Sequence, residues 1–505
     1  TVESFVEYVR KDAMGLVRED LVISIAERLN ETVHKIEKWG LPIKKDKKGN
    51  YKRRGRWNIE INGEALKPIL ANKVRKSGVK VINRINITDL ILDNNKVKGA
   101  YGFGVREPEF YIIEADAVII ATGGASGIYR PNNDGSAHHK IWYSPFNTGA
   151  GYAMGIRAGA EMTSFEMRFI ALRVKDIIAP TGTLALGFGA KQINANGERF
   201  MLDNFEDLGA EGAPTPIRVF GPTKELKEGR GPIFMDTTHL SNEEVKELKK
   251  SYLNMYPDLV LYWAANGFDP AEDLIEIRGT EPYIVGGHAQ AGYWINNKRE
   301  TTLEGLYAAG DVAGGAPYKF VSGCWVEGMI AAENAAAYIK KNKLKAKKEK
   351  EYENKTIAED YVIDEKKICT FRPLLRDNGI KPREMEEYLQ KVMDEYAGGV
   401  SRYYEMNEKE LNIALNKVRT LKKQLRYLKA KDIHQLMSCH EVIDRIYTAE
   451  TLLHHLIYRK ETRWPAYQSR TDYPEIDNEN WLKFVNSRMD GEKIIMFERP
   501  YSKIV

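Results

Sequence analysis

The chain has 505 residues, of which 43% are hydrophobic and 29% charged, as expected for a globular protein with more than one domain. Its net charge of +5 comes from 76 basic and 71 acidic residues, so nucleic-acid binding is not indicated. The three cysteines, Cys324, Cys369 and Cys439, form no CxxC pair, which excludes a disulfide framework, zinc site or iron–sulfur cluster of the chain's own.

The N-terminal third begins with apolar residues at helical spacing. Residues 3–39 show this spacing and end at Gly40-Leu41-Pro42, which predicts helical structure. A further helix is expected over 64–76, directly after Asn62-Gly63. From the residues alone, Glu64 is an acid in the first turn of this helix, where the helix dipole favours a carboxylate.

An alternating segment follows and leads into a glycine turn. Residues 79–115 alternate like strands, with a turn at Asn94-Asn95. The apolar run Val118–Ala121 predicts a central parallel strand. It ends in Thr122-Gly123-Gly124, where backbone can approach a ligand closely, although a structural turn also explains the motif.

The middle and the C-terminal part differ in pattern. The less regular segment 173–282 is interpreted as an inserted cap domain with a helix from Asn242 to Asn254. The Lys-rich run Leu344–Lys355 is interpreted as a linker. Beyond it, a helical bundle is predicted with helices at 383–397, 408–429 and 431–459. The aromatic tail from Arg463 is expected to pack over another surface.

The stretch 281–336 has the pattern of a flavin-binding segment. A Gly-rich turn carries His288, a short buried strand over Gly305–Ala309 ends in Gly310-Asp311, and a loop opens a helix near Ser322-Gly323. The acid can bind ribityl or ribose hydroxyls. The N–H groups of the helix start can face a group that becomes negative, such as the reduced flavin ring.

The usual dinucleotide fingerprint, G-x-G-x-x-G after an N-terminal strand, is absent from the sequence. The later pieces, ATGG and GLYAAGD, nevertheless favour a flavin site. We therefore expect the fingerprint to lie before Thr1, in a segment that this sequence lacks.

Three basic residues are candidates for holding an anion. Arg218, Arg230 and His288 lie in the turn-rich motifs TPIRVF, EGRGPI and GGHA, in or at the edge of the cap. Arginine donates bidentately to phosphate or sulfate, and histidine can supply a hydrogen bond or proton near neutral pH. For Arg218 a surface ion pair remains an equal alternative. Trp325 could stack on an adenine or flavin ring or fill the core.

Several long motifs resemble one family. GRWNIEINGEALKPI, TSFEMRFIALRVKD, EPYIVGGHA, TTLEGLYAAGDVAGGAPYKFVSGCWVEG and RWPAYQSRTDYPEID are similar to the alpha subunit of dissimilatory-type adenylylsulfate (APS) reductase or a relative that reduces the 3′-phosphorylated substrate, PAPS. That family belongs to the fumarate reductase and succinate dehydrogenase flavoprotein superfamily. The resemblance extends from Val2 to the C-terminus.

The resemblance implies an α/β fold, α+β overall. A Rossmann-like FAD-binding domain (1–172 and 283–343) would be interrupted by an α+β capping domain (173–282) and followed by a linker and a C-terminal helical domain with its tail (344–505). It also implies noncovalent FAD. The electron donor would be a ferredoxin-like iron–sulfur beta subunit that carries the [4Fe-4S] clusters, in a heterodimer or heterotetramer.

The resemblance also assigns roles to residues. Arg218 matches the catalytic arginine, and His288 matches the histidine that binds substrate. Glu64, in the NGE motif, Arg230 and Trp325 would bind substrate, with Trp325 near adenine and flavin. No metal ligands are expected. The residues expected to bind FAD are Thr122, Gly123, Gly124, Gly310, Asp311, Ser322 and Gly323.

The expected reaction is reduction of APS or PAPS to sulfite and AMP or PAP through an adduct of sulfite with FAD N5. No Trp occurs between Trp142 and Trp263, where the family carries one between flavin and cluster. The loop Lys175–Thr183 and the basic segment Ala137–Tyr143 differ from what the family would show near substrate, which leaves PAPS open as the substrate. The alternatives are a fumarate reductase or succinate dehydrogenase flavoprotein and a noncatalytic subunit. The expected compartment is the reducing cytoplasm, and no membrane span is expected.

Overall fold

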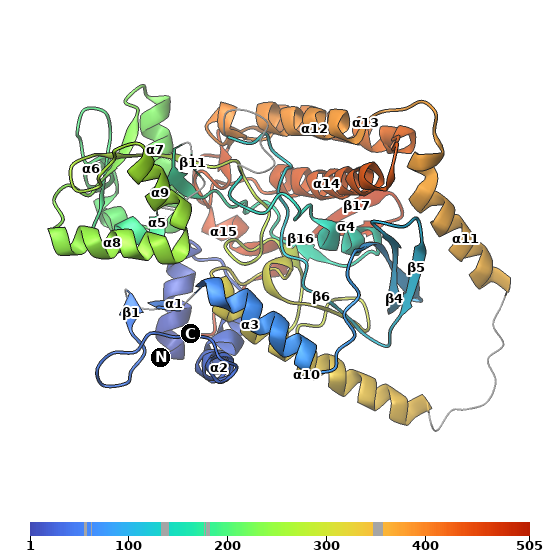
Figure 1. Cartoon of the computed structure of the whole chain (residues 1–505). Coiled ribbons are helices and arrows are strands. Elements are labelled where there is room, and N and C mark those ends of the chain that lie inside the picture. Colours follow the sequence, from blue (N-terminus) through green and yellow to red (C-terminus); the bar gives the residue numbers. More distant parts are fainter. Residues whose placement is uncertain (55–57, 62, 133–140, 176, 178–181, 347–356) are drawn as a thin grey trace.

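The computed structural model describes all residues except 55–57, 62, 133–140, 176, 178–181 and 347–356. Figure 1 shows a cap lobe, drawn in green, beside a larger body whose upper layer is formed by C-terminal helices. The predicted linker over 344–355 lies mostly outside the described residues. Parts of the segments Ala137–Tyr143 and Lys175–Thr183 also lie outside them.

The flavin-binding part contains a short parallel pair of strands. β6 (Val118–Ile120) pairs with β13 (Leu306–Ala308), with Val118 opposite Leu306. Helix α10 (Phe320–Ala346) packs against both strands. In the described part of the chain β6 has β13 as its one ladder partner, and Ile119 is 40% exposed. The predicted parallel strand is therefore confirmed, but among the described residues β6 lies at an edge of its sheet and not at the centre.

The N-terminal run forms two helices instead of one. α1 (Val2–Asp12) and α2 (Glu19–Lys38) are separated by a turn in which Met14 and Gly15 have positive φ values of 52° and 94°. The apolar spacing continues across this turn and therefore hides it. α3 (Gly63–Lys76) begins below the cap helix α8 (Figure 1).

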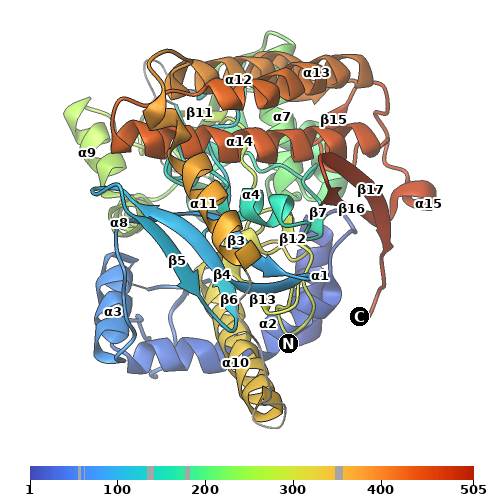
Figure 2. The same ribbon diagram turned by 90° about the vertical axis from the view of Figure 1, so that its right-hand side faces the viewer.

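The alternating segment forms an antiparallel meander, visible at the front of Figure 2. Its strands are β3 (Ile85–Asp93), β4 (Lys96–Gly104) and β5 (Phe110–Glu114). The predicted turn at Asn94-Asn95 is confirmed, and both residues have positive φ. The small pair β1 (Arg53–Arg54) and β2 (Asn58–Ile59) lies before α3.

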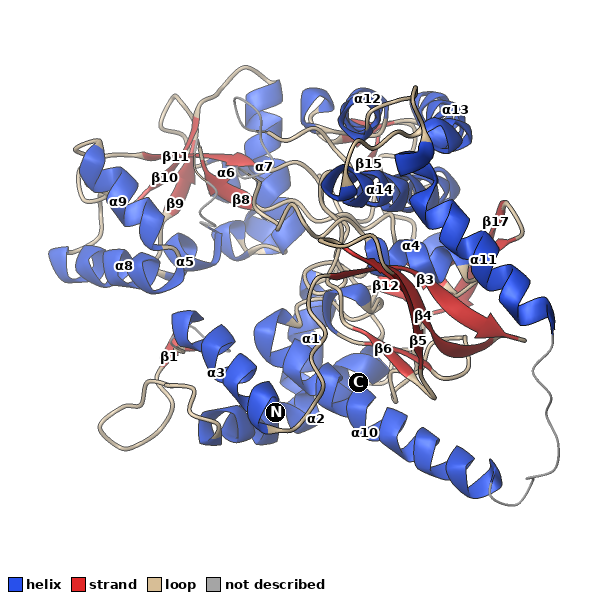
Figure 3. Cartoon of the chain, turned by 45° about the vertical axis from the view of Figure 1, so that its right-hand side comes forward, coloured by secondary structure: helices blue, strands red, loops and turns tan. Residues whose placement is uncertain are grey.

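The cap is built on one antiparallel sheet in the order β8-β11-β10-β9 (Figure 3). In the described part of the cap, five α-helices accompany the sheet, and α7 among them carries Arg218. The predicted helix at 242–254 is confirmed as α8. The strands are β8 (Leu172–Val174), β9 (Lys191–Ile193), β10 (Ile233–Asp236) and β11 (Ile275–Gly279). The helices are α5 (Gly182–Gly187), α6 (Phe200–Phe205), α7 (Thr215–Lys227), α8 (Asn242–Met255) and α9 (Pro257–Ala265).

The predicted bundle is confirmed. Its helices are α12 (Pro382–Tyr396), α13 (Glu408–Gln424) and α14 (Ile433–Tyr458), which pack on one another. A further helix, α11 (Ile357–Phe371), precedes them and contacts the 3-10 turn Arg372–Leu375. Helix α14 packs against α4 (Ala150–Arg157) of the flavin-binding part.

The tail returns to the flavin-binding part, as expected from its composition. β16 (Lys483–Asp490) pairs with β7 (Met162–Thr163) and with β17 (Lys493–Pro500), in a sheet that also contains β12 (Gly292–Tyr293). β14 (Glu405–Met406), β15 (Ser469–Arg470) and α15 (Asn478–Trp481) complete the region.

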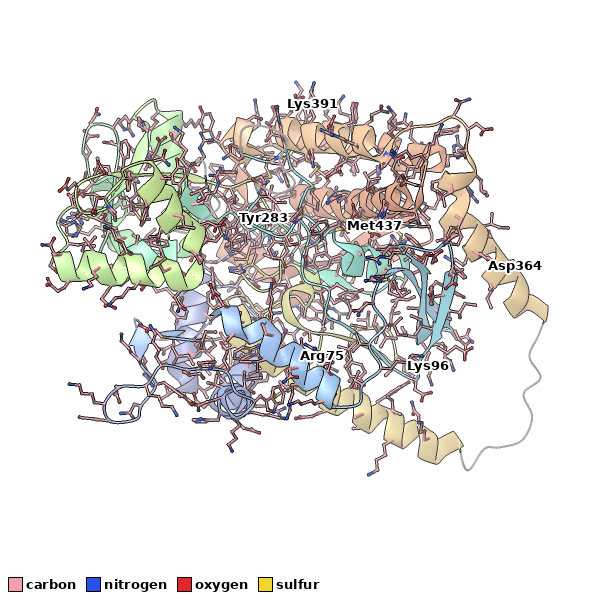
Figure 4. The ribbon with its side chains drawn as sticks, in the orientation of Figure 1. Arg75, Lys96, Tyr283, Asp364, Lys391 and Met437 are labelled. Carbon is pink, nitrogen blue, oxygen red and sulfur yellow. The ribbon has the colours of Figure 1, made fainter. Side chains whose placement is uncertain are left out.

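One buried apolar cluster unites three distant parts of the chain. It contains cap residues such as Ile233 and Trp263, Leu16 from the N-terminal turn, and Trp464 and Tyr467 from the tail. Tyr283, labelled near the centre of Figure 4, belongs to the same cluster. The candidate site lies on this shared core.

Candidate active site

The two parallel strands end at the same edge, where the predicted cofactor residues meet. Thr122-Gly123-Gly124 follows β6, and Gly310-Asp311 follows β13. The Tyr143 hydroxyl connects them, since it donates to Asp311 Oδ2 at 2.8 Å and accepts from the Gly124 N–H at 2.9 Å. An acid and exposed strand ends therefore lie together, as a ribityl or ribose group requires.

The backbone comes unusually close to the Asp311 carboxylate. A Cβ added at Gly287 would lie 1.7 Å from Asp311 Oδ1, so a side chain there would displace the acid. A Cβ at Gly123, whose φ is 76°, would lie 2.2 Å from Asn147 Nδ2. Only glycine fits these approaches. This glycine-lined edge fits a dinucleotide cofactor such as FAD, with Asp311 and Thr122 as its polar groups.

A buried ion pair supports the Gly310-Asp311 turn. Lys319 Nζ donates to the carbonyls of Gly310 and Ala313 at 2.8 and 2.7 Å and pairs with Glu327 Oε2 at 3.1 Å. Glu327 Oε2 also accepts from the Gly310 N–H at 2.8 Å. The sequence analysis missed both residues, although they lie eight positions apart in the GAPYKFVSGCWVEG motif, Lys319 directly before α10 and Glu327 within it.

The start of α10 approaches this edge. The helix begins at Phe320, so Ser322 and Gly323 lie in its first turn. The Gly323 N–H already donates to the Lys319 carbonyl at 2.8 Å. Trp325 is half-buried on the same helix, and its predicted contact with adenine or flavin stays a prediction.

His288 lies in a cage of aromatic rings. Its ring centroid is 4.6 Å from Phe169, 5.2 Å from Trp142 and 5.4 Å from Phe320. Its Nδ1 atom is buried without a hydrogen-bond partner among the described residues. Burial lowers the pKa of His288 below its ordinary value of 6.5, and the Asp311 carboxylate only partly opposes this. His288 is therefore neutral at pH 7 and can donate or accept one hydrogen bond there.

Arg218 is held by a short relay that crosses from the cap to α1. Its Nη2 donates to Thr215 Oγ1 at 2.6 Å, and that hydroxyl donates to Asp12 Oδ2 at 2.9 Å. The Thr215 N–H donates to Asp12 Oδ1 at 3.0 Å. Arg218 Nε is buried and has no partner in the part of the chain that the structure describes. No ion pair of Arg218 is found there either, which argues against the surface ion-pair alternative.

Tail residues join the two candidates. The Tyr467 ring is 5.7 Å from Phe169, which is itself the ring nearest to His288. On the other side, the tail packs on the turn after α1, where Trp464 Nε1 donates to the Ala13 carbonyl at 2.9 Å. The structure thus brings Arg218 and His288 to one region, lined by α1, the cap, the Gly-rich turn and the tail.

Two other predicted substrate residues are not part of this cluster. Arg230 donates to Glu225 at 2.6 and 2.7 Å and also pairs with Glu228, so carboxylates of the cap occupy its fork. We assign Arg230 to cap structure. Glu64 is exposed in the first turn of α3, and its role in substrate binding stays a prediction.

A pocket of 330 Å³ opens beside the relay. α1 and the segment before α7 line it with Ser4, Glu7, Tyr8, Lys11, Asp12, Gly212 and Pro214. Since Asp12 also binds Thr215, the pocket reaches the carboxylate that holds the Arg218 relay. The sequence analysis gave no role to Asp12, Thr215 or Tyr467. Tyr467 lies in the quoted motif RWPAYQSRTDYPEID, but the motif alone assigns it no function.

The described ranges contain no group of three or more His, Cys, Asp or Glu residues able to hold a metal ion. None of their helices has the length and apolar composition needed to cross a membrane.

The sequence and the fold of this chain are similar to those of known flavoproteins. Residues 1–319 match the family model described as FAD binding domain, and residues 386–500 match that described as fumarate reductase flavoprotein C-term. The alpha subunit of adenylylsulfate reductase from Megalodesulfovibrio gigas is 33% identical, and the match covers all of this chain and 86% of that protein.

Solved structures agree. Adenylylsulfate reductase from Archaeoglobus fulgidus is 38% identical with a TM-score of 0.92, over all of this chain and 86% of that chain. A structure of adenosine-5-phosphosulfate reductase in complex with sulfite, as a covalent adduct, has a TM-score of 0.91 and the same coverage. Escherichia coli quinol fumarate reductase shares the fold at 18% identity. The chain therefore belongs to the family of adenylylsulfate reductase alpha subunits, within the FAD-dependent flavoproteins related to fumarate reductase.

Proposed function

We propose that this chain is the catalytic flavoprotein subunit that reduces adenylylsulfate to sulfite and AMP. One observation supports this most: Arg218 and His288 each offer a buried nitrogen without a partner in the described structure, and His288 directly follows Gly287 of the glycine-lined edge that fits FAD. A buried unpaired donor is costly, so such atoms are expected to bind a ligand. An anion with several acceptor oxygens suits them.

The chain's own residues hold the phosphosulfate group in this proposal. Arg218 binds its oxygens and stabilises the charge that develops on the leaving phosphate. Neutral His288 donates to a sulfonate oxygen without adding a second charge, and its aromatic cage excludes water. Reduced FAD, when bound, would supply the two electrons that reduce sulfur(VI) to sulfur(IV). The S–O bond to the phosphate would break with its electron pair on the phosphate oxygen, so that AMP leaves and the sulfur is released as sulfite.

The electrons come from an iron–sulfur partner subunit in a heterodimer or heterotetramer, because the described chain has no cluster ligands. The three cysteines are free, so we place the complex in the reducing cytoplasm. We also propose the domain boundaries given above. The cap sheet and its helices, which lie between residues 172 and 279, support a cap over 173–282.

The test is a substrate comparison with the purified complex and reduced methyl viologen. We expect oxidation of the dye with adenylylsulfate, release of sulfite and AMP in equal amounts, and little oxidation with fumarate. Faster turnover with fumarate would replace the proposal by a dicarboxylate reductase. A preference for the 3′-phosphorylated nucleotide would keep the reaction and change the substrate to PAPS.

A further inference from the structure

One polar atom near Arg218 and His288 has no role in the functions proposed above. The hydroxyl of Tyr467 is buried and has no hydrogen-bond partner among the described residues, and Tyr467 as a whole is 0% exposed. An unpaired buried hydroxyl destabilises a fold, and most buried hydroxyls find a partner. The neighbours of Tyr467 therefore decide whether this hydroxyl serves binding.

The surroundings of Tyr467 fix the position of its ring. Arg168 Nε donates to the Tyr467 carbonyl at 2.8 Å, and the preceding residue, Ala466, has a positive φ of 66°. The ring packs edge-on against Phe169 at 5.7 Å. The backbone is therefore pinned from one side and the ring from another, so the hydroxyl cannot turn away to solvent.

The charges around the hydroxyl identify what it faces. Burial and the Asp12 carboxylate raise the pKa of Tyr467, and the Arg218 guanidinium partly opposes them. The phenol thus stays protonated and is a hydrogen-bond donor at neutral pH. Since Asp12 and Arg218 both belong to the relay, the hydroxyl lies close enough to the relay for both charges to act on it.

Resting on the proposed function, the geometry points to Tyr467 as a further substrate-binding residue, whose hydroxyl donates to an oxygen of the phosphosulfate group between Arg218 and His288. Three unpaired polar atoms then share one anion: Arg218 Nε, His288 Nδ1 and the Tyr467 hydroxyl. They come from the cap, the Gly-rich turn and the tail, so the anion would tie these three segments together.

Tyr467→Phe tests the inference, because it removes only the hydroxyl. We expect the thermal midpoint of the ligand-free complex to stay equal or rise, because no existing hydrogen bond is lost. We expect kcat/KM for adenylylsulfate to fall by about 10- to 100-fold, the effect of removing a hydrogen bond to a charged group.

Two other tyrosines provide matched controls. Tyr252, in the cap, also has a buried hydroxyl without a partner in the described structure, so Tyr252→Phe should change neither stability nor kinetics. Tyr129 donates to the Ala397 carbonyl at 2.9 Å and accepts from Arg168, so Tyr129→Phe should lower the thermal midpoint. A Tyr467→Phe variant that behaves like Tyr129→Phe, with reduced stability and unchanged kcat/KM, overturns the inference.

A binding readout separates this inference from the proposed function. Sulfate or AMP should raise the thermal midpoint of the wild-type complex, and this increase should be smaller in Tyr467→Phe. If the wild type fails to reduce adenylylsulfate, the proposed function falls, and the anion-induced shift still decides the role of Tyr467. An equal shift in both proteins overturns the inference, whatever the turnover.

Discussion

Two buried polar clusters of this molecule contrast in how far they are satisfied. In the first, Glu166 binds His455 at 2.9 Å and Arg459 at 2.8 Å, and Glu461 binds Arg459 and Arg463, each at 2.7 Å. None of their side-chain N or O atoms lacks a partner in the described structure. In the second, Arg218, His288 and Tyr467 each keep an atom unpaired.

The first cluster contributes to the stability of the fold, whereas the second is available to bind a ligand. The first cluster joins the flavin-binding part to α14 and the tail and needs nothing from outside. Burial alone would raise the pKa of Glu166, but Arg459 and His455 outweigh it and hold that pKa below its ordinary value of 4.5. The second cluster is incomplete until a ligand arrives. In these two clusters, therefore, the paired groups belong to the scaffold and the unpaired groups to the proposed site, whereas the unpaired hydroxyl of Tyr252 in the cap belongs to neither.

The largest expected effect is on the satisfied cluster. Glu166→Gln leaves Arg459 and His455 buried beside a neutral group, and should lower the free energy of unfolding by about 3–5 kcal/mol. Chemical unfolding of the flavin-loaded complex measures it. The matched control is Glu247→Gln on α8, whose exposed pair with Lys250 should contribute far less to stability. Equal losses in the two variants would remove the contrast.

Arg218→Ala should reduce activity and leave stability largely unchanged. It removes a donor aimed at the substrate, and kcat should fall by about a hundredfold or more while FAD stays bound. Steady-state assay and the flavin absorption spectrum measure the two properties. Arg230→Ala, made in parallel, should lower the thermal midpoint instead, since it frees Glu225 and Glu228. Near-normal turnover in Arg218→Ala would exclude this arginine from the chemistry.

The relay behind Arg218 should have a smaller effect. Thr215→Val removes the hydroxyl that accepts from Arg218 and donates to Asp12, so Arg218 loses its orientation. We expect kcat/KM to fall by about tenfold, as for one buried hydrogen bond to a charged group. Thr215→Ser keeps the hydroxyl and should restore most of the activity. If serine and valine act alike, packing of the methyl group matters and the relay does not.

The smallest effect concerns pH. The lowered pKa of His288 means that the unfolded chain binds this proton more tightly than the folded protein. The contribution of His288 to stability is therefore complete above pH 6.5 and is lost as the pH falls below that value. We expect no step in kcat/KM near pH 6.5 from this group. His288→Gln should flatten the acid slope of the thermal midpoint, and an unchanged slope would contradict the assignment.

Periodic elements of the fold could be predicted from the sequence. The helices α8, α12, α13 and α14 follow from apolar spacing, and the β3–β4 turn follows from Asn94-Asn95. The break between α1 and α2 could not be predicted in this way, because apolar spacing continues through Met14 and Gly15. Positive φ at these two residues depends on the tail, which donates to the Ala13 and Met14 carbonyls.

The site was predictable only in part, for a related reason. Motifs identified Arg218, His288 and Asp311, whose residue types suit an anion or a cofactor. Asp12 and Thr215 are separated by 203 positions, and no local pattern relates them. Arg230 carries the same chemistry as Arg218, and only the neighbouring Glu225 and Glu228 distinguish the two. Whether a buried group is paired is a property of packing, which sequence spacing does not encode.

The tail has a consequence for the timing of synthesis. Trp464 and Arg463 fix the turn that follows α1, and Tyr467 closes the space beside Phe169. During synthesis these contacts form only after α1, the cap and the Gly-rich turn have been made. A chain truncated before Arg463 therefore lacks the bonds that hold the turn after α1 and the ring that packs on Phe169.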